Sequence, residues 1–285
     1  PPPPPPFLMI RRPPRSTLEL DRRQRQMCIR DSSYDADIVI NTGDNTTDGL
    51  ETEYINAGRF LKAIKCRNVI STIGNHDKMN MRSHELFRHY ICSSEIITIP
   101  ESTTTKKKHL FLNREITKFR YNFTDVYHLT QVEIYRTRVL VISIDSNELY
   151  SDDGFVEKEV LNAVSQQINQ IEYDLLLLLT HYSILGSDEC PLKNSAVLID
   201  FVQKHKIEYV FCGHTHDLEL MRTTDLYKQH SFNHFRCGSL SSCNIENDDN
   251  MFVFYENLGD DQMHLHLIRI FQEKGKIIFK EEIVF

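Results

Sequence analysis

The sequence lacks a long apolar run, a paired-cysteine motif and an excess of basic residues. Its longest aliphatic run, Leu175–Leu179, is far too short to cross a bilayer, so we expect no transmembrane segment. Acidic residues outnumber basic ones by 40 to 33, which gives a formal net charge of -7. This balance supplies no electrostatic reason to expect DNA, RNA or an anionic membrane as a partner.

The seven cysteines form an odd set without any CxxC pair. This pattern favours neither a disulfide framework nor a thiolate zinc site. A reducing compartment is therefore expected, and a cytoplasmic location is predicted. The two Asn-x-Ser/Thr sequons, at Asn45 and Asn122, are interpreted as chance matches.

The first 33 residues differ from the rest of the chain. They open with a proline tract, are rich in arginine and show no helical or strand periodicity. The apolar stretch Phe7–Ile10 is too short for the apolar region of a secretory signal. We interpret residues 1–33 as a non-native leader fused to a truncated reading frame, the alternative being a natural disordered arm. Residues 34–285 are expected to form a single domain, or one with a modest cap, that lacks its first strand.

From Tyr34 onward, short apolar runs alternate with amphipathic stripes. Strands are predicted at residues 37–41, 68–73, 138–145, 175–180 and 207–212, and helices at 50–64, 81–91, 156–171 and 195–205. This alternation is typical of an α/β protein with largely parallel central strands. Beyond residue 227, strands without long helices predict an antiparallel portion or a second sheet.

Two local features complete this outline. The polar residues 101–108 predict an exposed loop. Asp48 and Glu51 have the spacing of a capping box, so Asp48 is interpreted as the cap of the helix at 50–64.

Polar side chains follow the carboxyl ends of four predicted strands. They are Asp44, then Asn75 and His76, then His181, and finally His214 and His216. Ligands of parallel α/β sheets bind at this edge, so these side chains are expected to lie close together. One carboxylate oxygen, one amide oxygen and three imidazole nitrogens suit manganese, iron or zinc better than magnesium or calcium. Asp145 also follows a strand, and its role is left open between a turn and the substrate side.

These residues carry a family resemblance. Gly43-Asp44, Gly74-Asn75-His76-Asp77, His181 and Gly213-His214-Thr215-His216 resemble, in order, the G-D, G-N-H-[DE], lone H and G-H-x-H motifs of the calcineurin-like metallophosphoesterase superfamily. The family's first motif, D-x-H, is absent from the residues near Phe7–Pro14. The stretch TGDNTTDGLETEY, with IDS at 144–146, is similar to the class III cyclic nucleotide phosphodiesterase branch. The resemblance implies a four-layer α/β/β/α sandwich of two mixed sheets flanked by helices.

The resemblance also implies roles for the residues. Asp44 would bridge two divalent ions, while Asn75, His181 and His214 would complete one ion's site. His216 would belong to the other site, which lacks its D-x-H pair, so the chain as given is expected to be an impaired enzyme. His76 would stabilise the transition state and protonate the leaving oxygen.

The implied reaction is attack by a metal-bridged hydroxide on a small phosphomonoester or phosphodiester, nucleotides included. A second interpretation stays open, in which the protein is a non-catalytic binding or scaffold protein that keeps the fold without the metal centre. Because every motif after residues 1–33 is intact, we favour the interpretation as a phosphoester hydrolase. The motifs predict no particular oligomeric state.

Overall fold

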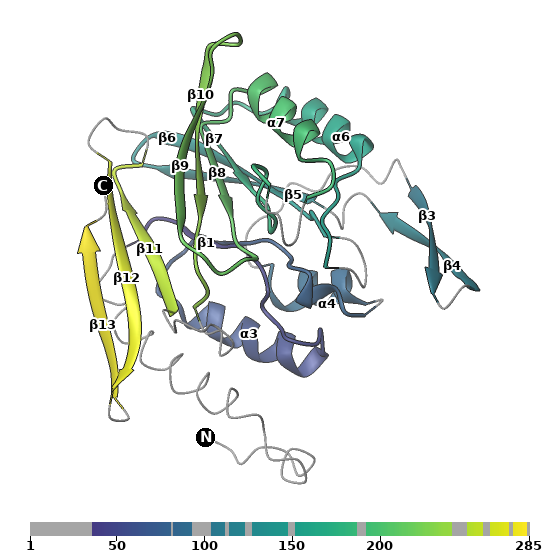
Figure 1. The fold of residues 1–285 in the computed structure, drawn as a ribbon, viewed down its shortest axis with the longest axis horizontal. Coiled ribbons are helices and arrows are strands. Elements are labelled where there is room, and N and C mark those ends of the chain that lie inside the picture. Colours follow the sequence, from purple (N-terminus) through teal and green to yellow (C-terminus); the bar gives the residue numbers. More distant parts are fainter. Residues whose placement is uncertain are drawn as a thin grey trace.

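The computed structural model describes residues 36–80, 82–92, 104–111, 114–122, 127–147, 152–186, 192–240, 250–258, 263–273 and 276–283. The predicted leader, residues 1–33, lies outside these ranges. Within them, helices lie among the strands as far as α7, and strands alone follow (Figure 1). The sequence predicted strands without long helices beyond residue 227, and the described residues there form strands and no helix.

A six-stranded mixed sheet forms the centre of the fold, in the order β5-β6-β7-β8-β10-β9. Its strands are β5 (Tyr127–Ile134), β6 (Thr137–Ile144), β7 (Leu175–Leu179), β8 (Tyr209–Cys212), β9 (Glu219–Asp225) and β10 (His230–Arg236). The four inner strands run parallel, and the two edge strands are antiparallel to their neighbours. The carboxyl ends of β6, β7 and β8 therefore meet at one edge of the sheet.

Helices α6 (Lys158–Ile168) and α7 (Ser195–Lys204) cover one face of this sheet (Figure 1). The aliphatic strand β7 is buried on both faces, which explains its unbroken run of leucines. Leu176 and Leu178 pack with the two helices, whereas Leu177 and Leu179 belong to a second cluster on the opposite face.

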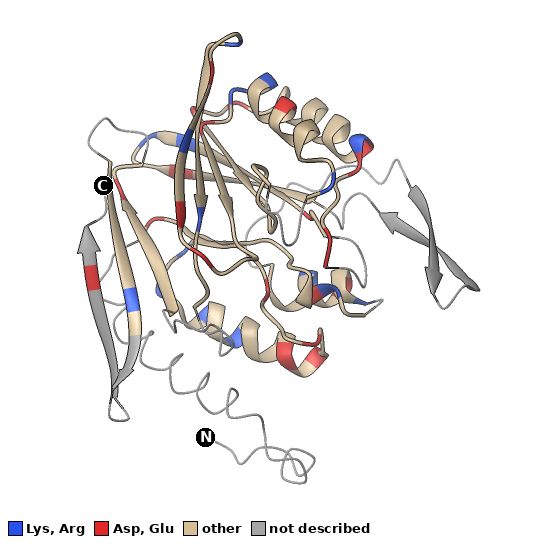
Figure 2. Cartoon of the chain, in the orientation of Figure 1, with Lys and Arg blue, Asp and Glu red and all other residues tan. Residues whose placement is uncertain are grey.

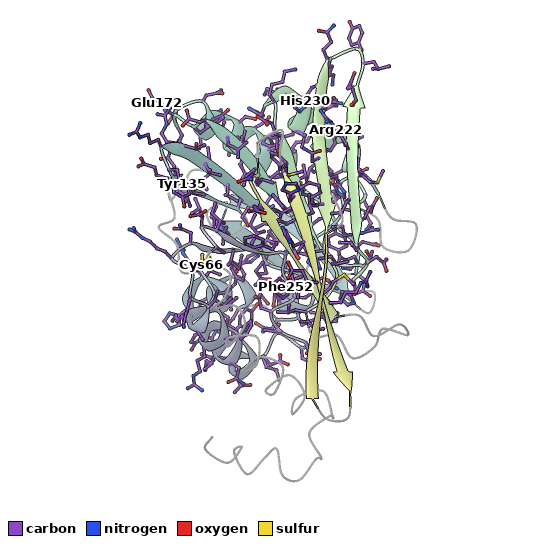
Figure 3. All side chains as sticks on the ribbon, turned by 90° about the vertical axis from the view of Figure 1, so that its left-hand side faces the viewer. Cys66, Tyr135, Glu172, Arg222, His230 and Phe252 are labelled. Atoms are coloured by element: carbon purple, nitrogen blue, oxygen red, sulfur yellow. The ribbon has the colours of Figure 1, made fainter. Side chains whose placement is uncertain are left out.

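The second cluster lies between the six-stranded sheet and a further layer of strands. In this layer β1 (Val39–Asn41) pairs in parallel with β2 (Val69–Ser71). Strands β11 (Asn250–Glu256), β12 (His264–Glu273) and β13 (Lys276–Ile283) form an antiparallel sheet. Figure 3 shows these three strands in front of the six-stranded sheet. Ile70 of β2 and Leu265 of β12 both pack in the second cluster, so both of these sheets face the same core.

Helices α3 (Glu51–Ala63) and α4 (Ser83–Tyr90) form the outermost layer on this side. Tyr54 and Leu86 of these helices pack with Val69 of β2 in a third cluster. The order of layers is thus helices, six-stranded sheet, further strands, helices, and the predicted α/β class is confirmed. In the described part, the second strand layer consists of two separately hydrogen-bonded sheets. None of the described helices is long and apolar enough to span a membrane.

Two local predictions were wrong. Strand β3 (Thr104–Phe111) pairs in antiparallel fashion with β4 (Arg114–Asn122), so residues 104–108 are not a loop. The polar composition of the segment suggested a loop, but pairing depends on a partner strand that local composition does not reveal.

The start of α3 also differs from the predicted capping box. Leu50, not Asp48, is the N-cap residue, and the carboxylate of Glu53 accepts hydrogen bonds from the N–H groups of Leu50 (3.0 Å) and Asp48 (3.1 Å). Acidic residues mark this first turn (Figure 2). The true spacing runs from residue 50 to residue 53, and it was missed because leucine carries no capping side chain.

Candidate metal centre

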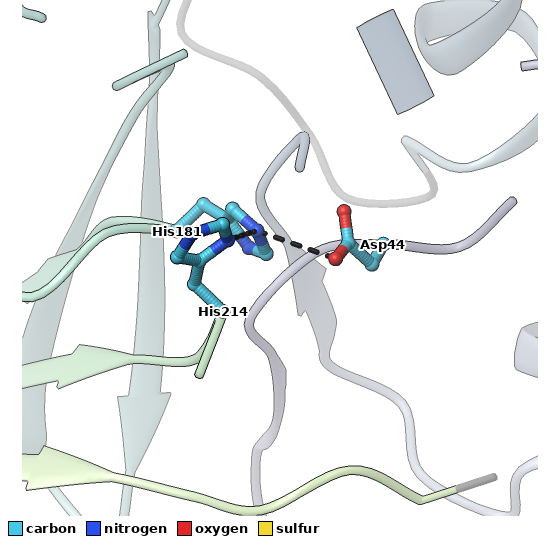
Figure 4. A group of neighbouring side chains, drawn as sticks. All are labelled: Asp44, His181 and His214. Carbon is cyan, nitrogen blue, oxygen red and sulfur yellow. Dashed lines mark hydrogen bonds and ion pairs between the residues drawn. The ribbon is translucent and has the colours of Figure 1, made fainter. Parts of the chain in front are cut away.

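Four loops at the carboxyl ends of β1, β2, β7 and β8 bring the predicted site residues together. Each loop contributes one side chain: Asp44, Asn75, His181 and His214 in turn. The ligand atoms of Asp44, His181 and His214 all lie within 4.8 Å of one another (Figure 4). The strands β1 and β2 form one parallel pair, the strands β7 and β8 belong to the six-stranded sheet, and the carboxyl ends of both pairs lead into loops that meet at this group.

The Nε2 atom of His181 lies at the middle of the group. It is 2.9 Å from Oδ1 of Asn75, 3.2 Å from Nδ1 of His214 and 3.4 Å from Oδ2 of Asp44. Oδ1 of Asn75 is in turn 3.2 Å from Nδ1 of His214. Two oxygens and two nitrogens therefore converge on one point.

The hydrogen bond of His181 on its far side fixes which nitrogen faces this point. Nδ1 is 2.7 Å from the carbonyl oxygen of Thr42, which can only accept, so Nδ1 carries the proton. Nε2 is then the nitrogen that faces the oxygens of Asn75 and Asp44. These oxygens accept hydrogen bonds but donate none, so their approach is balanced either by a proton on Nε2 or by a metal ion bound to the neutral ring. The donor set fits a divalent transition-metal ion.

The pKa values of these side chains depend on their burial and on the charges of their neighbours. Burial alone would lower the pKa of His181, but the Asp44 carboxylate raises it above its ordinary value. Burial would likewise raise the pKa of Asp44, but His181 lowers it to about 2. Burial and then the charge on His181 lower the pKa of His214 to about 4, so the ring of His214 is neutral near neutral pH.

The backbone is strained at three of the predicted ligands. Asp44, His214 and His216 have φ angles of 54°, 76° and 63°, in the left-handed region that residues other than glycine rarely adopt. Each such residue costs about 1–3 kcal/mol and persists only where its surroundings impose it. Such strain is typical of functional sites.

Two glycines allow the loops to approach closely. Gly43 has a φ of 105°, and a Cβ atom there would lie 2.8 Å from Nδ1 of His181 and 2.9 Å from the backbone nitrogen of Gly74. A Cβ atom on Gly74 would collide with the carboxylate of Asp44. These contacts explain why glycine precedes the candidate ligand in G-D and in G-N-H-D.

Asp77, the last residue of the GNHD tetrad, ties the first two loops together. Its buried carboxylate accepts hydrogen bonds from the N–H of Gly74 (2.9 Å) and the side-chain amide of Asn45 (3.0 Å). It also accepts from the N–H (2.9 Å) and hydroxyl (3.0 Å) of Thr46. Asp77 therefore holds the loop after β1 against the loop after β2.

His76 lies beside the group without joining it. Its backbone N–H donates to Oδ1 of Asp44 (3.1 Å), and its ring Nδ1 is 2.9 Å from the carbonyl oxygen of Thr47. Because that carbonyl oxygen accepts a hydrogen bond from the Nδ1–H group, Nε2 is the ring nitrogen that remains available for proton transfer. The ring is half-buried.

His216 is the predicted ligand that the structure does not bring into the group. In the described part of the chain, no hydrogen bond or ion pair joins it to Asp44, Asn75, His181 or His214, and the group within 4.8 Å excludes it. Burial lowers the pKa of its ring. The sequence contains no D-x-H motif that would complete a second site around it.

Sequence reasoning missed two neighbours of the group. The side-chain amide of Asn75 donates to Oδ1 of Asp152 at 3.4 Å, which leaves its Oδ1 facing His181. The ring of Tyr182 packs on His214 with 4.2 Å between centroids, and its hydroxyl donates to the carbonyl oxygen of Asp152 at 2.7 Å. Tyr182 adjoins His181 in sequence, but no motif marks Asp152.

Asp145, whose role was left open, is neither a surface turn nor a member of the group. Its carboxylate is buried and lies 2.8 Å from Nζ of Lys78 and 2.7 Å from Nε2 of His84.

The fold and the site together define an α/β protein with a candidate metal centre at the strand ends. A family model described as calcineurin-like phosphoesterase matches residues 19–218, more than half of the chain. The chain therefore belongs to the calcineurin-like phosphoesterase family. A search of curated proteins gave no significant match.

Several solved structures are similar to this one at low sequence identity. A single mutant of Vps29 from Entamoeba histolytica is 11% identical, with 92% of this chain and 89% of that chain covered and a TM-score of 0.39. GAP50, the anchor in the inner membrane complex of Plasmodium, is 12% identical, with coverage of 95% and 84% and a TM-score of 0.48. The calcineurin-like phosphoesterase YfkN from Bacillus subtilis is 12% identical, with coverage of 92% and 80% and a TM-score of 0.40.

Proposed function

We propose that this protein is a metal-dependent phosphoester hydrolase that acts on a small phosphomonoester or phosphodiester, nucleotides included. The observation that carries the proposal is the convergence of acceptor atoms around Nε2 of His181, with the opposite ring nitrogen committed to Thr42. An acceptor-only cluster of this kind is suited to a cation. Membership of the calcineurin-like phosphoesterase family supports the same reaction class.

Asp44, Asn75, His181 and His214 would hold one divalent ion of manganese, iron or zinc. Asp44 and His216 would contribute to a second. Bound divalent ions lower the pKa of water and neutralise the charge that develops on the phosphoryl oxygens during in-line attack. With fewer ligands, the second ion would be held more weakly.

The chain's own residues supply orientation and proton transfer. The N–H of His76 engages one carboxylate oxygen of Asp44, which leaves Oδ2 directed at His181. With Nδ1 committed to Thr47, Nε2 of His76 is the atom that would pass a proton to the leaving oxygen. A general acid of this kind contributes a factor of about 10²–10⁴ to the rate.

The test combines metal analysis with turnover of bis(p-nitrophenyl) phosphate and p-nitrophenyl phosphate in the presence of manganese. Asn75→Ala and His214→Ala should lower bound metal and rate together. His76→Ala should retain metal and lose about 10²–10⁴ in rate. His89→Ala, an exposed histidine on α4, is the matched control and should change neither.

Three outcomes separate the alternatives. Hydrolysis that falls with metal content supports the proposal. The absence of both metal binding and turnover of either ester favours the scaffold interpretation. Full activity after His214→Ala would overturn the dinuclear assignment.

A further inference from the structure

The residues that follow β6 touch two of the ligand loops without reaching the candidate centre. Asp145, Ser146 and Asn147 are all buried. They lie directly after the carboxyl end of a central strand, between the loop that carries Asn75 and the loop that carries His181. Their side chains could therefore set how these two loops stand relative to each other.

On one side, the segment holds both flanks of the GNHD tetrad. Nζ of Lys78 donates to Oδ2 of Asp145 (2.8 Å) and to the carbonyl oxygen of Asn147 (2.7 Å). The side-chain amide of Asn147 donates to the carbonyl oxygen of Ile73 (2.7 Å). Because Ile73 and Lys78 bracket the tetrad, both ends of the turn that presents Asn75 are fixed to the end of β6.

On the other side, the segment holds the loop after β7. The hydroxyl oxygen of Ser146 accepts hydrogen bonds from the backbone N–H groups of His181 and Tyr182, each at 3.2 Å. This serine is fully buried. One residue therefore orients the backbone of His181, while its two neighbours fix the loop of Asn75.

The ion pair in this segment is desolvated. The side chains of Lys78 and Asp145 are 2% and 3% exposed. Burial alone would raise the pKa of Asp145, but Lys78 and then His84 hold it below its ordinary value. A buried pair of this kind adds little net stability but demands one geometry, because a displaced partner leaves an uncompensated charge.

We propose that Lys78, Asp145 and Ser146 are positioning residues, which set the separation between Oδ1 of Asn75 and Nε2 of His181 and thereby the affinity of the centre for its ion. The inference rests on the proposed function in taking these two atoms as ligands. Outer partners of this kind typically change metal affinity about 10–100-fold when they are removed.

The test measures manganese affinity by calorimetry on the full chain. Ser146→Ala removes the acceptor for two N–H groups. The double variant Lys78→Met/Asp145→Leu removes both charges of the buried ion pair, and with them the carboxylate that contacts His84. Each should weaken manganese binding about 10–100-fold. Lys78→Arg, which keeps the charge and the donors, should bind more tightly than Lys78→Met.

The matched control is Val164→Ala, on the buried face of α6, in a core cluster that includes Tyr182 but none of the predicted ligands. It should lower the stability of the fold while leaving manganese affinity within about twofold, because it removes apolar packing and no hydrogen bond that holds either ligand loop. A positioning variant that affects affinity no more than Val164→Ala, at a comparable loss of stability, would overturn the proposal.

Amide hydrogen exchange gives a second reading that needs no metal. Residues 74–78 and 181–182 should exchange faster in Ser146→Ala and in the double variant, but not in Val164→Ala. If the unaltered chain binds no manganese, the proposed function fails, and exchange alone decides the positioning role. Unchanged exchange in both loops would then refute it.

Discussion

The imidazole of His181 donates its Nδ1 proton to the carbonyl oxygen of Thr42 over 2.7 Å, across 139 residues of sequence. This bond joins the loop after β7 to the loop after β1. It leaves Nε2 of His181 as the nitrogen that faces the oxygens of Asp44 and Asn75. One backbone carbonyl thus selects the ring form that a metal ion requires.

Replacing His181 should remove the atom at the middle of the group. In His181→Gln, we expect manganese affinity to fall by at least about 10–100-fold, since the amide cannot present a ring nitrogen at the same place. Calorimetric titration with manganese measures this. The exposed control His89→Ala should match the unaltered chain, and equal affinity in both variants would contradict the assignment of His181.

Gly74→Ala should be costly because a Cβ atom would collide with the carboxylate of Asp44. We expect the free energy of unfolding to drop by about 3 kcal/mol, with loss of bound manganese. Gly186→Ala is the contrast, since Gly186 has open space around it but a φ of 93°. It should cost only the backbone term of about 1–2 kcal/mol and keep the metal. Urea unfolding of both variants decides the matter, and equal costs would show that the close approach is unimportant.

The start of α3 gives a matched pair of variants. Glu53→Ala removes the acceptor for the N–H groups of Leu50 and Asp48, so it should destabilise the fold by about 1 kcal/mol. Asp48→Ala should be close to neutral, because Leu50 is the N-cap. Thermal unfolding of the two proteins tests this, and a larger loss for Asp48→Ala would restore the predicted capping box.

The strand ends were predictable because periodicity marks buried strands and the polar residues after them stand out. Asp44, Asn75, His181 and His214 were expected at one edge of a sheet for this reason. The structure brings them together, but from the strand ends of two separate sheets. Their order along the chain was itself a signal, since each closes a separate apolar run.

Contacts between distant loops could not be predicted in the same way. Lys78 and Asp145 are 67 residues apart, and neither carries a local pattern that announces the other. The strand at Thr104–Phe111 was missed for the same reason, because pairing with β4 outweighs its polar composition. Local sequence thus located the candidate ligands, whereas tertiary contacts determine how their loops are held.

Acid should weaken the buried pair of Lys78 and Asp145. A carboxyl whose folded pKa lies below its unfolded value, about 3.9, stabilises the fold above that value and loses this contribution as pH falls toward the folded pKa. The stability of the unaltered chain, relative to Lys78→Met/Asp145→Leu, should therefore decline below about pH 4. Urea unfolding from about pH 6 to about pH 3 measures this difference, and a constant difference over that range would contradict the ionised pair.

The most direct test of the central claim is anomalous diffraction from crystals of the chain grown with manganese. The account predicts a manganese peak bonded to Oδ2 of Asp44, Oδ1 of Asn75, Nε2 of His181 and Nδ1 of His214. Ordered loops with no anomalous peak between these four side chains, or manganese bound only elsewhere, would contradict it.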